Sequence, residues 1–239
     1  MREILTTAEL VRVSGGEPLI VWAGQGFRPG VRAWYDGDAV LAAAPDLSNR
    51  NRLAVVGPVD AAARLVAGAL AELGPSFRAF GDEQLIRDLA VRVPELSFSA
   101  AFGWMHTSEL PVMTTTAAWL EGDTGVEALL TEAAPASYAW PGRSGVRRWA
   151  AATGDGGELL SVAADAWSAP EFGFLAGVAT RPAARGRGLS RQVCAFVTAE
   201  LLKQHGRVGL MVDRDNAAAI AIYQRLGYTY RRVAAAHFQ

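Results

Sequence analysis

A short apolar strand, a loop of glycine and arginine and a long helix follow one another without a break between residues 171 and 204. The helix, residues 188–204, carries an apolar stripe with the spacing of one helical face, which predicts that it packs against a sheet. A strand at 208–212, a helix at 217–226 and a strand at 228–238 follow. The second half of the chain is therefore predicted to end in a β-α-β-α-β order, which is typical of α/β proteins.

The loop of residues 185–190, Arg-Gly-Arg-Gly-Leu-Ser, has the physical properties of an anion site. Its glycines let backbone N–H groups converge, the helix that follows contributes the positive end of its dipole, and Arg185 and Arg187 add full charges. The loop has neither the Gly-Lys-Ser/Thr of a P-loop nor the Gly-x-Gly-x-x-Gly of a dinucleotide fold. It predicts a diphosphate site, with a solvated helix cap as the alternative.

A second motif lies downstream with fixed spacing: Asn216-x-x-Ala219-x-x-x-Tyr223-x-x-x-Gly227-Tyr228. It follows a predicted strand and runs along the next predicted helix. Taken alone, it is also typical of a short amphipathic helix that ends at a glycine and carries an ordinary half-buried tyrosine. Its meaning therefore depends on the loop that precedes it.

The two motifs together resemble the GNAT superfamily of acyl-CoA-dependent N-acetyltransferases, whose signature is Arg/Gln-x-x-Gly-x-Gly/Ala followed by Asn-x-x-Ala-x-x-x-Tyr-x-x-x-Gly-aromatic. Arg185, Gly188 and Ser190 fill the first pattern, with Ser190 as a small substitute, and every position of the second pattern is matched. The resemblance covers about residues 125–239. It implies an α/β fold in which a central mixed, mostly antiparallel sheet is flanked by helices.

The resemblance implies that acetyl-CoA binds as the acyl donor along the strand of residues 171–180 and the loop after it. The family's pantetheine arm pairs with this strand, here with the backbone of Val178 and Thr180, and Asn216 matches the residue that binds the pantetheine amides. Tyr223 matches the residue that protonates the departing thiolate, and a phenol, with a pKa of about 10, is close enough to a thiol for this step. The implied cofactor-binding residues are Val178, Thr180, Arg185, Gly186, Arg187, Gly188, Leu189, Ser190, Asn216 and Tyr223.

The general base is the part of the mechanism that the sequence does not supply. Some family members place a glutamate on the central strand, where this chain has Phe172. Glu171 is one residue off and would point to the opposite face of a regular strand. Asp165, His106 and Glu109 are further candidates, and a water relay is equally compatible.

The activity implied by the resemblance is that of an enzyme, an acetyl-CoA-dependent N-acetyltransferase that acts on a primary amine of a small molecule or peptide. The amine would attack the thioester directly, a backbone N–H near Val178 would hold the developing oxyanion, and no metal would be needed. Two alternatives stay open: transfer of a longer acyl chain, and a CoA-binding module without turnover. The missing carboxylate on the central strand favours the second alternative.

The first half of the chain alternates short strands and helices but has no Arg-x-x-Gly-x-Gly loop. Its pattern resembles a degenerate GNAT-like repeat, so the predicted domains are residues 1–120 and 121–239, with the crossing at 110–125. The predicted strands are 19–23, 31–35, 39–43, 53–56, 77–80, 98–105, 146–153, 158–167, 171–180, 208–212 and 228–238. The predicted helices are 9–13, 59–73, 82–91, 126–133, 188–204 and 217–226.

Composition argues against several classes of partner. The 239 residues carry 23 Lys and Arg against 24 Asp and Glu, a net charge of -1, so no general field attracts nucleic acid or an anionic membrane. The start of the chain has no signal-peptide pattern, and no run reaches the roughly 20 apolar residues of a membrane span. The only cysteine, Cys194, rules out an internal disulfide. We therefore expect a cytoplasmic monomer or homodimer.

Overall fold

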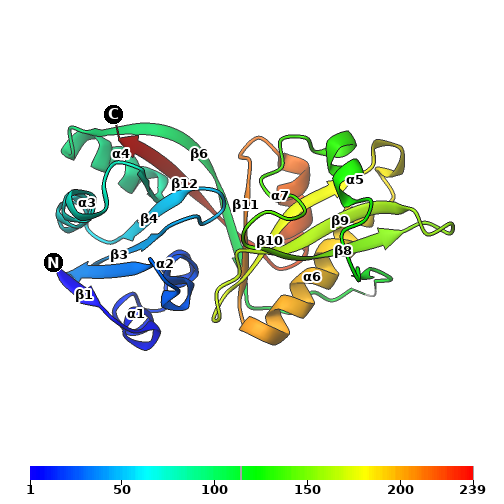
Figure 1. The fold of residues 1–239 in the computed structure, drawn as a ribbon, viewed down its shortest axis with the longest axis horizontal. Helices are drawn as coiled ribbons and strands as arrows, with labels where there is room; N and C mark the ends of the chain where they lie inside the picture. Colours follow the sequence, from blue (N-terminus) through cyan, green and yellow to red (C-terminus); the bar gives the residue numbers. More distant parts are fainter. Residues whose placement is uncertain (114, 239) are drawn as a thin grey trace.

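The computed structural model describes residues 1–113 and 115–238. Its strands form one 12-stranded sheet in the order β1-β2-β3-β4-β5-β12-β6-β11-β10-β9-β8-β7 (Figure 1). The β4–β5 and β10–β11 pairs are parallel, and the other neighbours are antiparallel. The strands are β1 (Arg2–Ile4), β2 (Arg32–Asp36), β3 (Ala39–Ala44), β4 (Asn51–Val56), β5 (Phe77–Asp82), β6 (Leu96–Thr107), β7 (Ala118–Trp119), β8 (Val146–Thr153), β9 (Leu159–Ala166), β10 (Gly173–Thr180), β11 (Val208–Val212) and β12 (Thr229–Phe238).

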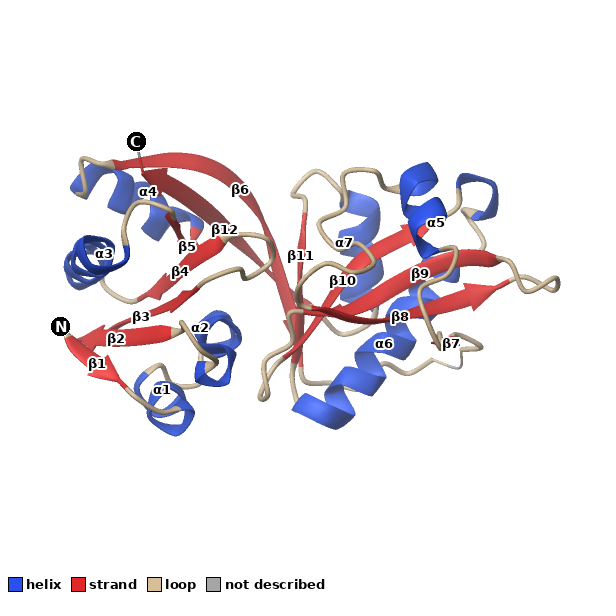
Figure 2. Ribbon diagram, in the orientation of Figure 1, coloured by secondary structure: helices blue, strands red, loops and turns tan. Residues whose placement is uncertain are grey.

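Helices cover both faces of this sheet (Figure 2). Successive strand residues enter different cores: Leu41 packs with α3 and α4, whereas Ala42 packs with α1 and α2 on the opposite face. In the C-terminal half, α6 and α7 cover one face and α5 contributes to the core on the other. The helices are α1 (Thr7–Val13), α2 (Pro18–Gly24), α3 (Val59–Leu73), α4 (Glu83–Arg92), α5 (Val126–Ala133), α6 (Leu189–His205) and α7 (Ala217–Arg225), with short 3-10 turns at η1 (Gln25–Phe27) and η2 (Pro182–Ala184). No helix among the described residues is both long and apolar enough to cross a membrane.

The same order of elements occurs twice along the chain. The segment β4-α3-β5-α4-β6 corresponds to β10-α6-β11-α7-β12, and in each the first two strands are parallel. The final strands of the two segments are exchanged: β12 lies between β5 and β6, and β6 pairs with β11 (Figure 2). Both halves therefore have a related α/β arrangement, and each completes the sheet of the other.

Aromatic side chains fill the core where the two halves meet. Trp22 of α2 stacks on Phe174 of β10 with ring centroids 4.6 Å apart, and it lies 5.3 Å from Trp104 of β6. The indole Nε1 of Trp22 also donates to the carbonyl oxygen of Trp167 at 3.0 Å. These contacts fix the N-terminal helices against the central strand of the C-terminal half.

The mixed, mostly antiparallel sheet flanked by helices confirms the predicted fold class, and most predicted elements are present. The hairpin through Asp36, Gly37 and Asp38 forms as expected, with Gly37 at a φ of 55°. Residues 19–23, however, are not a strand but the centre of α2. The predicted crossing at 110–125 also contains a short edge strand, β7, which pairs with β8.

Candidate active site

Two parallel strands, β10 and β11, separate soon after they start. Their register pairs Gly173 with Val208 and Phe174 with Gly209, and no pairing follows along the rest of β10. On its other side β10 stays paired with β9 as far as Thr180. The backbone of β10 towards Thr180 therefore has one edge that is not used by the sheet, and that edge can accept an extended ligand as an extra strand.

A bulge in β10 lies within this open stretch. The register with β9 shifts between Ala176 and Ala179, and Gly177 between them has a φ of 64°. A Cβ on Gly177 would lie 2.6 Å from Cη2 of Trp149. Both the left-handed backbone and the contact with the indole therefore require glycine at this position.

Gly177→Ala is expected to lower the free energy of unfolding by about 2–4 kcal/mol, because it adds backbone strain and an overlap in a packed region. Gly186→Ala is the matched control, since Gly186 also has a positive φ of 78° but nothing lies within 4 Å of its Cβ position. Denaturant unfolding of both variants measures the difference. Equal losses would show that Trp149 does not constrain the bulge.

The loop between β10 and α6 presents backbone to open space. Gly186 and Gly188 have φ values of 78° and 75°, and an added Cβ at either would meet nothing within 4 Å. Gly188 is the N-cap of α6 and has no side chain to bind the first N–H groups of the helix. Arg185 is exposed, and its Nε and Nη2 lie 3.4 Å from the carbonyl oxygens of Thr180 and Ala133. A free helix end beside an arginine is a favourable arrangement for binding an anion.

The open edge of β10 and the glycine loop both face a cleft of about 1220 Å³. The cleft continues across the sheet to the N-terminal half, where residues of β4, β5, β6 and β12 line it. Arg187 is the one predicted cofactor-binding residue that is absent from its lining. The predicted residues that line it are Val178, Thr180, Arg185, Gly186, Gly188, Leu189, Ser190, Asn216 and Tyr223.

Tyr223 and Asn216 reach the cleft from α7. The Asn216 side chain accepts from the N–H of Ala219 at 3.0 Å, which caps the helix and fixes the orientation of the amide. Tyr223 is buried, with its ring centroid 5.8 Å from that of Tyr228. Burial raises the pKa of Tyr223 well above its usual range, and the nearby Cys194 acts in the same direction. The phenol is therefore protonated at neutral pH and carries a proton that a leaving thiolate could take, but it is a weaker acid than a solvent-exposed phenol.

The four side chains considered as general base do not line the cleft. Glu171 lies in a turn before β10, because Ala169 and Phe172 form a bridge and the strand starts only at Gly173. Among the described residues of the cleft, Asp213 is the only carboxylate, and it is exposed at the end of β11. The candidates outside the lining are His106, Glu109, Asp165 and Glu171.

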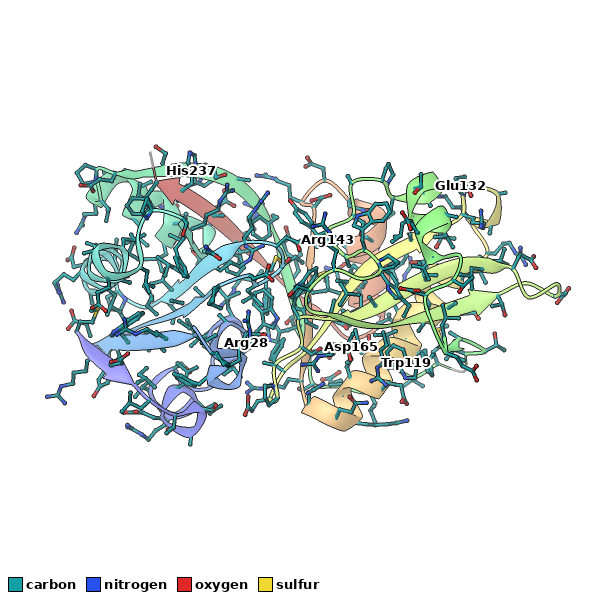
Figure 3. All side chains as sticks on the ribbon, viewed as in Figure 1. Arg28, Trp119, Glu132, Arg143, Asp165 and His237 are labelled. Carbon is teal, nitrogen blue, oxygen red and sulfur yellow. The ribbon has the colours of Figure 1, made fainter. Side chains whose placement is uncertain are left out.

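Asp165 has a structural role instead. One oxygen of this buried carboxylate accepts from Ser168 Oγ at 2.6 Å, and the other lies 3.4 Å from Nε of Arg148. The guanidinium of Arg148 in turn lies 3.8 Å from the centroid of a Trp119 ring. Asp165 and Trp119 both lie in the C-terminal half (Figure 3). These contacts occupy Asp165 within the C-terminal half and away from the cleft.

Several residues of the cleft were not predicted. Arg50, Arg52 and Arg78 come from the N-terminal half, and Tyr138 comes from the loop after α5. They are far apart in the sequence and belong to no recognisable motif. The one signal in the sequence was a charged residue in each of two apolar strands, Arg52 in β4 and Arg78 in β5, which is unusual for buried strands.

Comparison with known proteins gives matches to part of the sequence and to the whole fold. The FR47-like protein family matches residues 156–236. A GCN5-related N-acetyltransferase from Kribbella flavida has 18% identity and a TM-score of 0.60, over 96% of this chain and 95% of that chain. An acetyltransferase from the GNAT family of Colwellia psychrerythraea has 14% identity and a TM-score of 0.52, over 100% of this chain and 99% of that chain. A tandem GNAT protein from the clavulanic acid biosynthesis pathway has 12% identity and a TM-score of 0.50, over 98% of this chain and 96% of that chain.

No curated protein matches the sequence. The matched segment, residues 156–236, contains β10, the glycine loop, α6 and α7, so the sequence match and the two motifs fall on the same part of the structure. The solved structures, in contrast, match along nearly the full length of the chain. The protein therefore has the fold of the GNAT superfamily.

Proposed function

We propose that the protein is an acetyl-CoA-dependent N-acetyltransferase that acts on a primary amine of a small molecule or peptide. The observation that carries this proposal is the unpaired edge of β10 next to the glycine loop at the start of α6. An extended arm and a diphosphate, joined as they are in CoA, need these two features side by side. The family resemblance and the GNAT fold support the same assignment.

The described residues fit such a ligand. The backbone of Val178 and Thr180 would pair with the pantetheine arm, and the amide of Asn216 would bind it from α7. Gly186 and Gly188 leave the space above the loop empty, so phosphate oxygens can approach the backbone N–H groups. Leu189, Ser190 and the charge of Arg185 complete the proposed site, and Arg187 stays a predicted contributor from the same loop.

Acetyl-CoA supplies the acyl group as a thioester, which the acceptor amine attacks directly. A backbone N–H near Val178 donates to the oxygen on which negative charge develops, and it does so from a fixed position in β10. Oη of Tyr223 donates its proton to the departing sulfur. The proton released by the amine leaves through water, because the cleft offers no buried carboxylate among its described residues.

One observation favours each of the two alternatives, a longer acyl donor and a CoA-binding module without turnover. At about 1220 Å³ the cleft exceeds the roughly 300–1,000 Å³ of usual small-molecule pockets, so it has room for an acyl chain longer than acetyl. The lack of a buried carboxylate in the described lining would suit a CoA-binding module without turnover. We retain the cytoplasm as the proposed location and residues 1–120 and 121–239 as the proposed domains.

Thiol release separates these functions. It is measured from acetyl-CoA and from longer acyl-CoAs across an amine library, beside calorimetric binding of each donor. Release that requires both donor and amine, with acetyl-CoA as the best donor, supports the proposal. Faster release from a longer donor assigns the protein to that acyl group instead. Tight binding of acetyl-CoA without release from any donor would overturn the enzymatic assignment.

Arg185→Ala is expected to weaken CoA binding by about 10- to 100-fold while pantetheine binding stays nearly unchanged. The guanidinium adds a charge-assisted interaction only at the diphosphate end of the ligand. Calorimetry with both ligands measures the contrast. Equal losses for CoA and pantetheine would contradict the placement of the diphosphate at this loop.

Arg187→Ala is the comparison for that experiment. Arg187 belongs to the same loop but does not line the cleft, so a smaller loss of CoA affinity is expected. A loss as large as that of Arg185→Ala would place both arginines at the diphosphate.

A further inference from the structure

Arginines of the N-terminal half line the same cleft as the glycine loop. Arg52 lies on β4 and Arg78 on β5, and the register of these parallel strands pairs the two residues directly. Side chains in register on neighbouring strands leave the same face of the sheet, about 4.8 Å apart at the backbone. Arg50, at the end of the loop before β4, lines the same cleft. Like charges placed opposite each other destabilise a sheet, so this arrangement needs an explanation.

Arg52 is buried without an acidic partner. It is 7% exposed, its Nε donates to the carbonyl oxygen of Leu47 at 2.9 Å, and its guanidinium lies 5.2 Å from the Phe80 ring centroid. Among the described residues, no carboxylate lies within 4.0 Å of its guanidinium or of those of Arg50 and Arg78. Burial lowers the pKa of Arg52 to about 10, and the charges of Arg50 and Arg78 act in the same direction. A buried, unpaired charge is costly, and an anion in the cleft would relieve that cost.

One acidic residue, Asp46, lies near the arginines but does not neutralise their charge. Asp46 lines a small neighbouring cleft together with Arg50 and Arg78. Asp46 is exposed, and its carboxylate forms no ion pair with either arginine. The positive charge of the arginines therefore faces the main cleft uncompensated.

The loop before β4, which carries Arg50 and the Leu47 carbonyl that binds Arg52, has several residues in the left-handed conformation. Asp46, Ser48 and Asn49 all have positive φ values, 49°, 54° and 58°, although none is glycine. Such conformations cost energy and tend to be kept where a binding site requires them. Nδ2 of Asn49 donates to the carbonyl oxygen of Tyr138 at 2.8 Å, which ties this loop to the C-terminal half. The arginine cluster is thus fixed relative to the open edge of β10.

We propose that Arg50, Arg52 and Arg78 bind an oxyanion of the acceptor, a carboxylate or a phosphate, so that the substrate is an amine with a negative group at its other end. The planar guanidinium fork suits both groups. This inference rests on the proposed function. Asn49 contacts Tyr138, and Ala139 lies next to the bulge of β10 at Gly177, so the arginine cluster and the open edge of β10 border one cleft.

Acceptor preference tests the proposal. At saturating acetyl-CoA, kcat/KM is measured for ω-amino carboxylates and aminoalkyl phosphates of increasing length, beside neutral alkylamines of matched length. We expect the anionic amines to exceed the neutral ones of matched length by about 10- to 100-fold, and Arg78→Gln to remove that advantage. Whether carboxylates or phosphates react faster identifies the natural oxyanion. Arg12→Gln, on the exposed surface of α1, is the matched control and is expected to keep the preference.

Direct anion binding provides a readout that does not need turnover. Inorganic phosphate and succinate are titrated while thermal unfolding is followed, in the wild type and in the Arg185→Ala variant, whose loop site is weakened. Both anions are expected to raise Tm in these proteins but not in Arg52→Met or Arg78→Gln. Without anion, Arg52→Met is itself expected to have a higher Tm than the wild type, because it removes a buried unpaired charge.

The outcomes separate this inference from the proposed function. Turnover without preference for anionic amines, or a preference that survives Arg78→Gln, overturns the inference and leaves acetyl transfer standing. Anion binding that requires Arg52 and Arg78, without thiol release from any donor, supports the anion site and counts against acetyl transfer. A loss of acetyl-CoA affinity in Arg78→Gln would assign the oxyanion to the coenzyme and overturn its assignment to the acceptor.

Discussion

Tyr223→Phe is expected to lower kcat by about 10²- to 10⁴-fold with little change in acetyl-CoA affinity. The substitution removes only the hydroxyl and keeps the ring, which packs 5.8 Å from Tyr228 in the core. If Oη donates the proton to the leaving sulfur, the lost interaction exists mainly in the transition state. General acid catalysis is typically worth this range of rate. Steady-state kinetics with a verified acceptor, together with calorimetric binding of acetyl-CoA, measures both quantities.

Tyr228→Phe is the matched control for this experiment. Its hydroxyl lies 2.8 Å from Oγ1 of Thr198, and it does not line the cleft. We expect Tyr228→Phe to lose stability and keep its kcat, and Tyr223→Phe to show the reverse. If Tyr223→Phe turned over like the wild type, Tyr223 would be structural and the proton would have to come from water or another residue.

The buried phenol also gives a pH dependence with a definite sign. Burial keeps the pKa of Tyr223 well above about 10, the ordinary value that the residue regains on unfolding. Its contribution to stability is therefore complete below pH 10 and is lost as the pH rises further, because only the unfolded state then releases the proton. The unfolding free energy of the wild type is therefore expected to fall relative to that of Tyr223→Phe above that pH.

Gly188→Val is expected to abolish acetyl-CoA binding while unfolding stays cooperative. Gly188 has a φ of 75°, lines the cleft and has nothing within 4 Å of its Cβ position. The Cβ of a valine there would have no atom of a distant residue within 4 Å, and the side chain would occupy the space in which phosphate approaches the backbone. Calorimetry and thermal unfolding on the same sample measure affinity and fold. Unchanged affinity would remove the loop from the site.

Gly206→Val controls for the backbone cost of that change. Gly206 caps the other end of α6, also with a positive φ of 72° and open space around its Cβ position, and it is not part of the cleft. Both variants carry the strain of a β-branched residue in the left-handed region. We expect similar losses in Tm from the two, and a loss of acetyl-CoA binding from Gly188→Val alone.

Residues 19–23 show where local patterns stop being informative about the fold. The run is apolar and fully buried, and such a run fits a buried strand and a buried helix equally well. Residues at the start of α2 favour the helix: Pro18 occupies the first turn, and the Glu17 side chain accepts from the N–H of Ile20 at 3.0 Å. The longer periodic segments, α3 and α5, begin and end where the sequence predicts. Amphipathic spacing over several turns distinguishes a helix from a strand, whereas a run of five apolar residues does not.

The candidate site likewise has a part that local sequence patterns predict and a part that they do not. The loop and the helix that carries Tyr223 follow each other within one local unit, so the spacing of their residues predicts that they meet at one cleft. The arginine pair depends on the register of β4 against β5, which brings Arg52 opposite Arg78 across a long stretch of chain. No periodicity in a single sequence specifies that contact. The sequence left the general base open among several side chains and water, and the strand predicted to begin at Glu171 begins only at Gly173.

The exchange of β6 and β12 affects how the chain reaches this structure. Val233 pairs with Asp82 on one side and with Phe102 on the other, so the N-terminal half cannot close its sheet until a distant segment arrives. Pairings of such high sequence separation slow folding, because chain entropy is lost before the contacts that compensate for it form. We expect a single calorimetric unfolding transition rather than two, and refolding that is slow for a chain of 239 residues.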